Sequence, residues 1–409
     1  MAELLHPHEP GPRPGSRPQW GAFLELGFRP LYLAGCLWAI VSVALWVYAP
    51  QSLTGMLSGV FWHAHETLWG FVATIAVGFL LTAGANWTNI NPLHGRPLGG
   101  LTLLWIISRA GFLIPGAQAF GIAALCELLF FACAAVALGR AIYRSRSQRN
   151  YGVPFLVLGL GAADGLYLWA TWTGGYARLM PNFAVGLLCM AVIALLIARR
   201  VIPFFAMRAV SGLLIPMHTR SGQWQSAIGV LAIVFLLLDW HIAAAVALAI
   251  VGCLTVWQIL AWRPWAVRRV PLLWILYIGY AALGIGLLVA AAQSAGWVTR
   301  AAWTVHTIGV AGFSVLIIGM VTRTALGHLG RPLRTDSSMV AAYLLIILAA
   351  TLRLAALAPT TFSLTVLHAS AGAWLLGFML YLWRFFPMLI RPRADRLPAT
   401  ATVQSRKSS

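Results

Sequence analysis

Long apolar runs alternate with short polar connections along almost the whole chain, from about Leu26 to Ile390. A helix needs roughly 20 consecutive apolar residues to cross the hydrocarbon core of a bilayer, and these runs have that length. The pattern therefore predicts an all-α fold with about twelve transmembrane helices. The predicted spans are 26–48, 62–84, 98–115, 119–141, 152–172, 180–202, 224–240, 242–262, 271–293, 300–322, 338–358 and 361–388.

The composition agrees with a multi-pass membrane protein. Of the 409 residues, 60% are hydrophobic and only 9% are charged, and no soluble domain of this size could shield so many apolar side chains from water. We expect one transmembrane domain over residues 23–390, with polar, disordered tails at 1–22 and 391–409. The first twenty residues lack a signal-peptide cleavage site, so the first span is expected to direct insertion.

The net charge of +19 is best explained by topology. The arginines are not gathered on a soluble face, which argues against a nucleic-acid partner and leaves the lipid bilayer as the main one. They concentrate in the connections after the even-numbered spans, whereas the odd-numbered connections carry only Arg178, Arg300 and Arg353. By the positive-inside rule, the arginine-rich connections and both termini are cytoplasmic.

Three ionisable residues fall inside successive spans: Arg109 in the third, Glu127 in the fourth and Asp164 in the fifth. An unpaired charge is costly at membrane depth, so such residues are expected to have partners or a function. We predict a structural ion pair between Arg109 and either Glu127 or Asp164. A proton path through the same residues is the alternative.

The stretch FWHAHETLWG at 61–70 places two imidazoles and a carboxylate at the start of the second span. A helix turns about 100° per residue, so His63 and His65 point about 200° apart and cannot bind one ion in a regular helix. Glu66 is expected to share a face with His63, and Trp69 with His65. We interpret the histidines as ligands of two neighbouring centres, or as one ligand and one residue that supports it. Glu66 is suited to orienting a ligating imidazole.

His306 and His368 lie near the outer ends of the tenth and twelfth spans, at a depth similar to that of His63 and His65. Imidazole is the common protein ligand of haem iron and of copper. A single histidine in a span is more often a hydrogen-bonded structural residue. A pair beside a carboxylate, with further histidines at matching depth, favours a metal or haem site.

Two segments of the chain resemble signatures of the NnrS family: WHAHE at 62–66, followed by GFLLTA at 78–83 and NWT at 86–88, and TRTALGHLGRPL at 322–333. The resemblance extends over essentially the whole chain. It implies a haem- and copper-containing bacterial inner-membrane protein associated with denitrification and with relief of nitric oxide stress. The resemblance covers His63, His65, Glu66, Arg323 and His328. Together with His306 and His368, which are placed by their depth in the spans, these are the residues expected to bind the cofactors or metals.

Three functions follow as hypotheses. The first is a protein that binds or metabolises nitric oxide, with an unknown electron donor if it is an oxidoreductase. The second is a haem-copper oxidase or reductase, which the sequence argues against because the sixth span has no histidine and no adjacent His-His pair occurs. The third is a secondary transporter, or a metal- or haem-handling protein without redox turnover.

Overall fold

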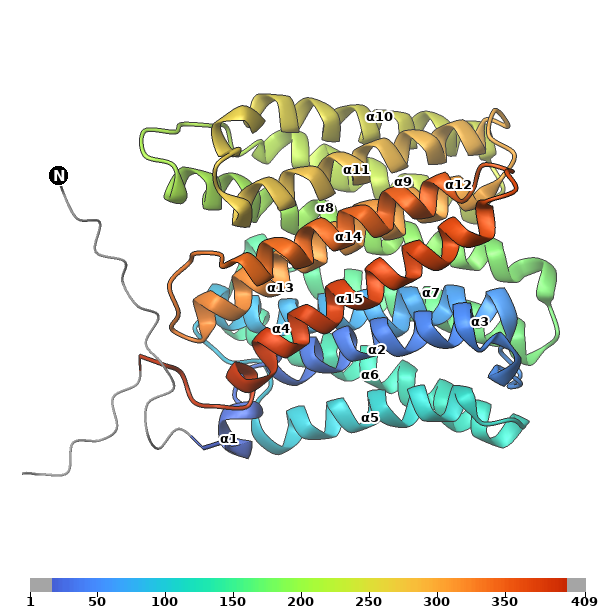
Figure 1. The fold of residues 1–409 in the computed structure, drawn as a ribbon, viewed down its shortest axis with the longest axis horizontal. Coiled ribbons are helices and arrows are strands. Elements are labelled where there is room, and N and C mark those ends of the chain that lie inside the picture. The colour runs from blue at the N-terminus through green and yellow to red at the C-terminus, as the bar shows by residue number, and fades with distance from the viewer. Residues whose placement is uncertain (1–16, 396–409) are drawn as a thin grey trace, which may run out of the picture.

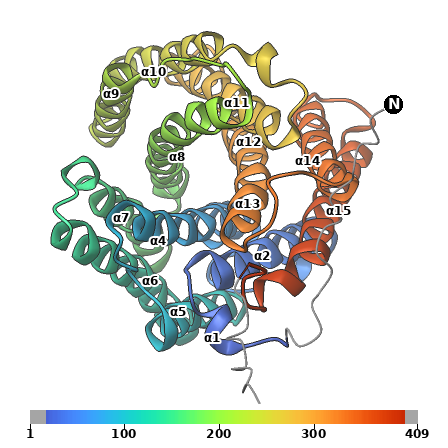
Figure 2. The ribbon, with the colours of Figure 1, turned by 90° about the vertical axis from the view of Figure 1, so that its left-hand side faces the viewer.

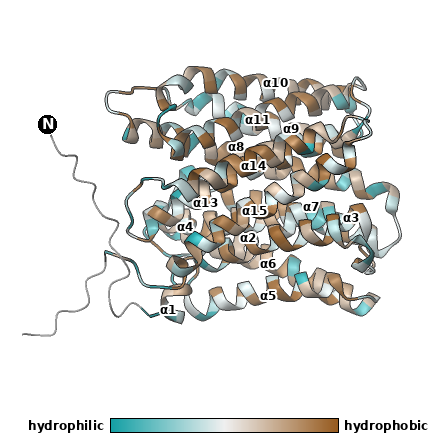
Figure 3. Cartoon of the chain, in the orientation of Figure 1, coloured by the Kyte–Doolittle hydropathy of each residue, from teal (hydrophilic) through white to brown (hydrophobic). Residues whose placement is uncertain are grey.

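The computed structural model describes residues 17–395, and this part of the chain contains helices but no strand. The helices lie roughly side by side along one direction (Figure 1). Figure 3 shows apolar residues over most of their length, with hydrophilic residues gathered toward both ends. The prediction of an all-α membrane protein is therefore confirmed. Most of the two predicted tails, residues 1–16 and 396–409, lies outside the described range.

Ten helical segments of the described range are long and apolar enough to cross a membrane. They are α2 (Phe28–Tyr48), α3–η2–α4 (Gly59–Thr88), α6 (Ala117–Arg144), η3–α7 (Gln148–Trp172), η4–α8 (Tyr176–Ala209), α10 (His241–Ala261), α11 (Pro271–Ser294), α12–η6–α13 (Ala301–His328), α14 (Ser337–Ala355) and α15 (Ser363–Leu389).

The remaining two predicted spans are also helices, α5 (Gly95–Leu113) and α9 (Thr219–Leu237), each of 19 residues. They pack against α6 and α10, respectively. The connections also contain short helices: α1 (Trp20–Phe23), η1 (Pro50–Ser52) and η5 (Pro264–Val267).

Helices that follow one another in the chain are mostly neighbours, as in the pairs α5–α6, α6–α7, α10–α11 and α14–α15. The first and last long helices, α2 and α15, also contact each other, as the end-on view shows (Figure 2). Small residues bring some helices close together. A side chain at Gly279 of α11 would meet the backbone nitrogen of Leu316 at 2.6 Å, so only glycine permits this approach between α11 and α13.

Two of the long segments change from α- to π-helix directly after a histidine. Segment η2 (Glu66–Ala73) follows His65, and η6 (Thr307–Ser314) follows His306. Hydroxyl groups bond to carbonyls of the widened turns, since Thr74 Oγ1 donates to Gly70 O at 2.9 Å and Ser314 Oγ donates to Gly309 O at 3.0 Å. Single π-helical turns are rare and often occur at functional sites. The two segments contact each other in the bundle.

Both described ends of the chain lie at the same end of the bundle, on the left in Figure 1. The backbone N–H of Gln19 donates to the carbonyl of Ile390 at 3.0 Å, which ties the start of the described chain to the end of α15. The short helices α3 and α12, which carry His63, His65 and His306, lie at the opposite end.

Candidate functional site

The two histidines of the second predicted span enter different surroundings. Both belong to the short helix α3, but His63 lines a cavity, whereas His65 is fully buried in a polar network. The side chains of His63 and His65 therefore point in different directions, as expected from the helical phase. The network and the cavity are therefore separate candidate sites on one helix.

Glu66 connects the other members of the polar network. Its Oε2 accepts hydrogen bonds from Trp38 Nε1 and Arg109 Nη1, each at 2.6 Å, and its Oε1 accepts from His65 Nδ1 at 2.9 Å. The expectation that Glu66 shares a face with His63 is wrong, because the carboxylate turns to His65 instead. Trp38 from α2 and Arg109 from α5 hold the carboxylate beside His65, and η2 begins at this residue.

The other ring nitrogen of His65 faces two further carboxylates. His65 Nε2 lies 3.0 Å from Asp164 Oδ1 on α7 and 3.4 Å from Glu127 Oε2 on α6. Glu127 also forms an ion pair with Nη2 of Arg109. The predicted ion pair between Arg109 and Glu127 is thus confirmed, whereas Asp164 contacts His65. All five ionisable side chains are at most 3% exposed.

Aromatic rings enclose the His65 imidazole. The rings of Phe112, Trp69 and Tyr167 have centroids 4.9, 5.3 and 5.7 Å from it. The hydroxyl of Tyr167 donates to the carbonyl of Phe61 at 2.8 Å, and Trp69 Nε1 donates to the carbonyl of Leu160 at 3.1 Å. The expected proximity of His65 and Trp69 is observed. No sequence pattern singles out Trp38 or Tyr167, because aromatic residues are common throughout the chain.

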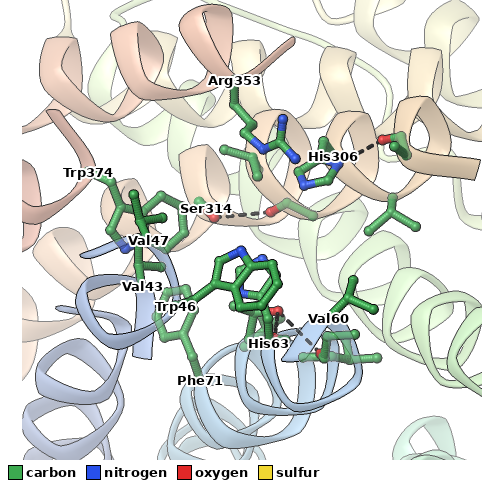
Figure 4. A pocket seen from close by; sticks show the side chains of 18 of the residues that line it. Val43, Trp46, Val47, Val60, His63, Phe71, His306, Ser314, Arg353 and Trp374 are labelled. Carbon is green, nitrogen blue, oxygen red and sulfur yellow. Dashed lines mark hydrogen bonds between the residues drawn. The ribbon is translucent and has the colours of Figure 1, made fainter. Parts of the chain in front are cut away.

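A cavity of about 480 Å³ lies beside the network, and both His63 and His306 line it (Figure 4). Its other walls are largely aliphatic and aromatic, and Arg353 reaches it from α14 beside His306. The Trp46 ring stacks on the His63 imidazole with centroids 5.1 Å apart and planes at 10°. Two histidines that are far apart in the sequence thus line one apolar cavity, near the end of the bundle where α3 and α12 lie.

The hydrogen bonding of His306 determines which ring nitrogen is free. Its Nδ1 lies 2.8 Å from the carbonyl of Ala302, and a carbonyl can only accept. Nδ1 therefore carries the hydrogen, and Nε2 keeps a lone pair for a ligand. His63 Nδ1 is buried and has no hydrogen-bond partner within the described residues.

His368 does not join this cavity. Its side chain is exposed, its ring lies 5.5 Å from that of Tyr48, and the neighbouring residues Leu367 and Ser370 line the cavity instead. The sequence predicts a similar depth for His368 and His306, but the rotation of α15 turns the His368 side chain outward.

Arg323 and His328 lie at the other end of the bundle, in a second cavity of about 1220 Å³ whose lining includes several arginines. The Arg323 guanidinium lies 3.8 Å from the centroid of the Phe205 ring. His328 Nε2 accepts a hydrogen bond from Asn86 at 3.5 Å. The fold therefore separates this pair from His63 and His306.

The apolar bundle with a buried ionisable network defines a polytopic α-helical membrane protein with a buried polar site. A family model described as NnrS protein matches residues 22–393, and the chain belongs to this family. A comparison with curated proteins finds no match.

Proposed function

We propose that this protein binds or metabolises nitric oxide at a haem- and copper-containing centre in the bacterial inner membrane and so relieves nitrosative stress during denitrification. The observation that supports this proposal is the apolar cavity shared by His63 and His306. Nitric oxide is small and uncharged and dissolves in the bilayer, so a cavity among membrane helices is accessible to it.

The residues around the cavity fit a haem. His306 offers Nε2 as a ligand because Ala302 fixes the other nitrogen, and His63 supplies a second imidazole from another helix. Arg353 provides a guanidinium that can pair with a propionate. The volume of about 480 Å³ lies within the range of cofactor and ligand sites. Imidazole also suits copper, so the same pair is a candidate ligand set for that metal.

The residues of the cavity would have distinct tasks. A bound haem would supply an iron atom able to bind nitric oxide. Trp46 restricts the orientation of the His63 ring by stacking on it, and Ala302 restricts that of His306. The apolar walls exclude water, which strengthens electrostatic interactions inside the cavity. Turnover would further require an electron donor; without one, the protein would bind and sequester nitric oxide.

Optical spectroscopy of the purified full-length protein tests the ligand assignment. We expect His63→Ala and His306→Ala each to abolish or shift the haem absorption bands, because each removes a donor from the cavity. His368→Ala is the matched control, since its exposed ring does not line the cavity, and it should leave the bands unchanged. Unchanged bands in both cavity variants would contradict the assignment.

Metal and haem analysis of the same samples, followed by nitric oxide consumption with an artificial reductant, separates turnover from binding. A protein that contains neither haem nor copper, and that catalyses uptake into proteoliposomes, would favour the alternative of a transporter.

A further inference from the structure

We infer that the polar network around His65 binds one divalent metal cation, held by His65 Nε2 and the carboxylates of Glu127 and Asp164. This site is separate from the cavity of His63 and His306, and the inference does not depend on the proposed nitric oxide chemistry. The ligands come from α3, α6 and α7, whose side chains meet at this point of the fold.

The spacing of the donor atoms suits metal coordination. One ligand atom from each of the three residues lies within 4.8 Å of the other two. His65 Nε2 is 3.0 Å from Asp164 Oδ1 and 3.4 Å from Glu127 Oε2. Ligands about 2.1 Å from an octahedral or tetrahedral ion are about 3.0 to 3.4 Å apart. The two separations from His65 Nε2 therefore match edges of a coordination polyhedron.

The charge of the network calls for a cation. Glu66, Glu127 and Asp164 together contribute −3, and Arg109 contributes +1, so the buried network carries −2 when His65 is neutral. Within the described residues, Arg109 is the only arginine or lysine in ion-pair contact with these carboxylates. A buried net charge is strongly unfavourable unless it is compensated. One divalent cation brings the sum to zero.

Protons alone compensate this charge less well. One proton can be shared along the 3.0 Å contact between His65 Nε2 and Asp164 Oδ1, which leaves the network at −1. A second proton would lie on Asp164 Oδ2 or Glu127 Oε2, and both atoms are buried without a hydrogen-bond partner in the described structure. A buried hydroxyl without an acceptor is costly. The same two oxygens have lone pairs available for a metal ion.

The surroundings of His65 orient it as a metal ligand. Its Nδ1 donates to Glu66, and a bond from the second ring nitrogen to a carboxylate is the usual arrangement for a ligating histidine. Trp38 and Arg109 in turn fix Glu66. One imidazole and two carboxylates form a hard to borderline donor set, which favours Mn²⁺, Fe²⁺ or Zn²⁺ over copper(I).

Mn²⁺ titration of the purified, chelator-treated full-length protein, followed by electron paramagnetic resonance, tests this site. We expect one bound Mn²⁺ per chain with nitrogen coupling from a single imidazole. Asp164→Asn and Glu127→Gln should each weaken Mn²⁺ binding at least tenfold, and His65→Gln should remove the nitrogen coupling. Asp239→Asn is the matched control because that carboxylate is 64% exposed and remote from the network; its affinity should equal that of the unaltered protein.

Two results would overturn the inference. The first is that the unaltered protein binds no Mn²⁺, Fe²⁺ or Zn²⁺, or that it binds Mn²⁺ without nitrogen coupling. This measurement uses the unaltered protein, so it does not depend on the folding of any variant. The other is equal Mn²⁺ affinity in Asp164→Asn, Glu127→Gln and Asp239→Asn. Haem bands recorded on the same samples distinguish the two proposals. Mn²⁺ binding by a haem-free protein would support the cation site while contradicting the proposed function.

Discussion

His63 and His65 are separated by a single residue, yet one faces an apolar cavity and the other a charged network. Their different surroundings follow from helical rotation, which directs alternate residues to nearly opposite sides. The polar partners of His65 come from η2, α6 and α7. At the scale of residues, the network depends on Arg109, which bridges Glu66 and Glu127.

Replacement of Arg109 by methionine should destabilise the protein strongly. The change leaves two buried carboxylates without their cation, and removing one partner of a buried ion pair costs about 3–5 kcal/mol. The expected result is a lower midpoint of thermal unfolding in detergent, measured by intrinsic fluorescence.

Arg178→Met is the matched control for this prediction. Arg178 and Asp239 are 69% and 64% exposed and lie 3.9 Å apart, so solvent screens their interaction. An exposed pair of this kind contributes at most about 1 kcal/mol. Equal losses in the two variants would show that the buried network does not stabilise the fold.

At the scale of elements, the π-helical segment η2 positions the network and requires a small residue within it. A side chain at Gly70 would meet Glu66 Oε2 and Trp38 Nε1, each at 2.8 Å, and it would also collide with Arg109. At Gly70 the backbone of η2 therefore lies so close to the charged groups that only glycine fits there. The widened turn and the glycine together make room for the guanidinium.

Gly70→Ala should lower stability by about 1–3 kcal/mol, because overpacking displaces buried side chains. Gly159→Ala, in α7, is the control: beyond the backbone of its own helix and its chain neighbours, no described atom lies within 4 Å of the added Cβ. Alanine favours a helix over glycine by up to about 1 kcal/mol, so this variant should be neutral or slightly more stable. Unfolding midpoints that rank the two variants in the opposite order would contradict the account of η2.

At the scale of the whole molecule, the bundle has two unlike ends. Residues Arg149, Arg200, Arg208 and Arg334 line the cavity at one end, whereas His63 and His306 line the cavity near the other. We propose that the arginine-rich end faces the cytoplasm, as the positive-inside rule predicts. The cavity of His63 and His306 would then lie toward the outer face.

Cysteine labelling tests this orientation in a variant whose native cysteines are replaced. Gln148 and Thr173 are exposed at the two ends of the segment that contains α7. We expect an impermeant maleimide to label Thr173→Cys in intact spheroplasts, and Gln148→Cys only after permeabilisation. The reverse pattern would invert the orientation. Labelling of both from one side would show that this segment does not cross the membrane.

The sequence alone determined the fold class, because apolar runs of about 20 residues satisfy their backbone hydrogen bonds in lipid only as helices. It also indicated the family, an ion pair of Arg109 with either Glu127 or Asp164, and the divergence of His63 from His65. These features follow from composition, periodicity and short motifs.

Only the tertiary structure decided which residues meet. It turned Glu66 toward His65, and it placed His63 and His306, but not His368, in one cavity. It also placed π-helical turns directly after two of the histidines. The physical reason is that these contacts depend on the rotation and packing of helices far apart in the chain. No local pattern specifies them, since a change of one residue in helical phase turns a side chain by about 100°.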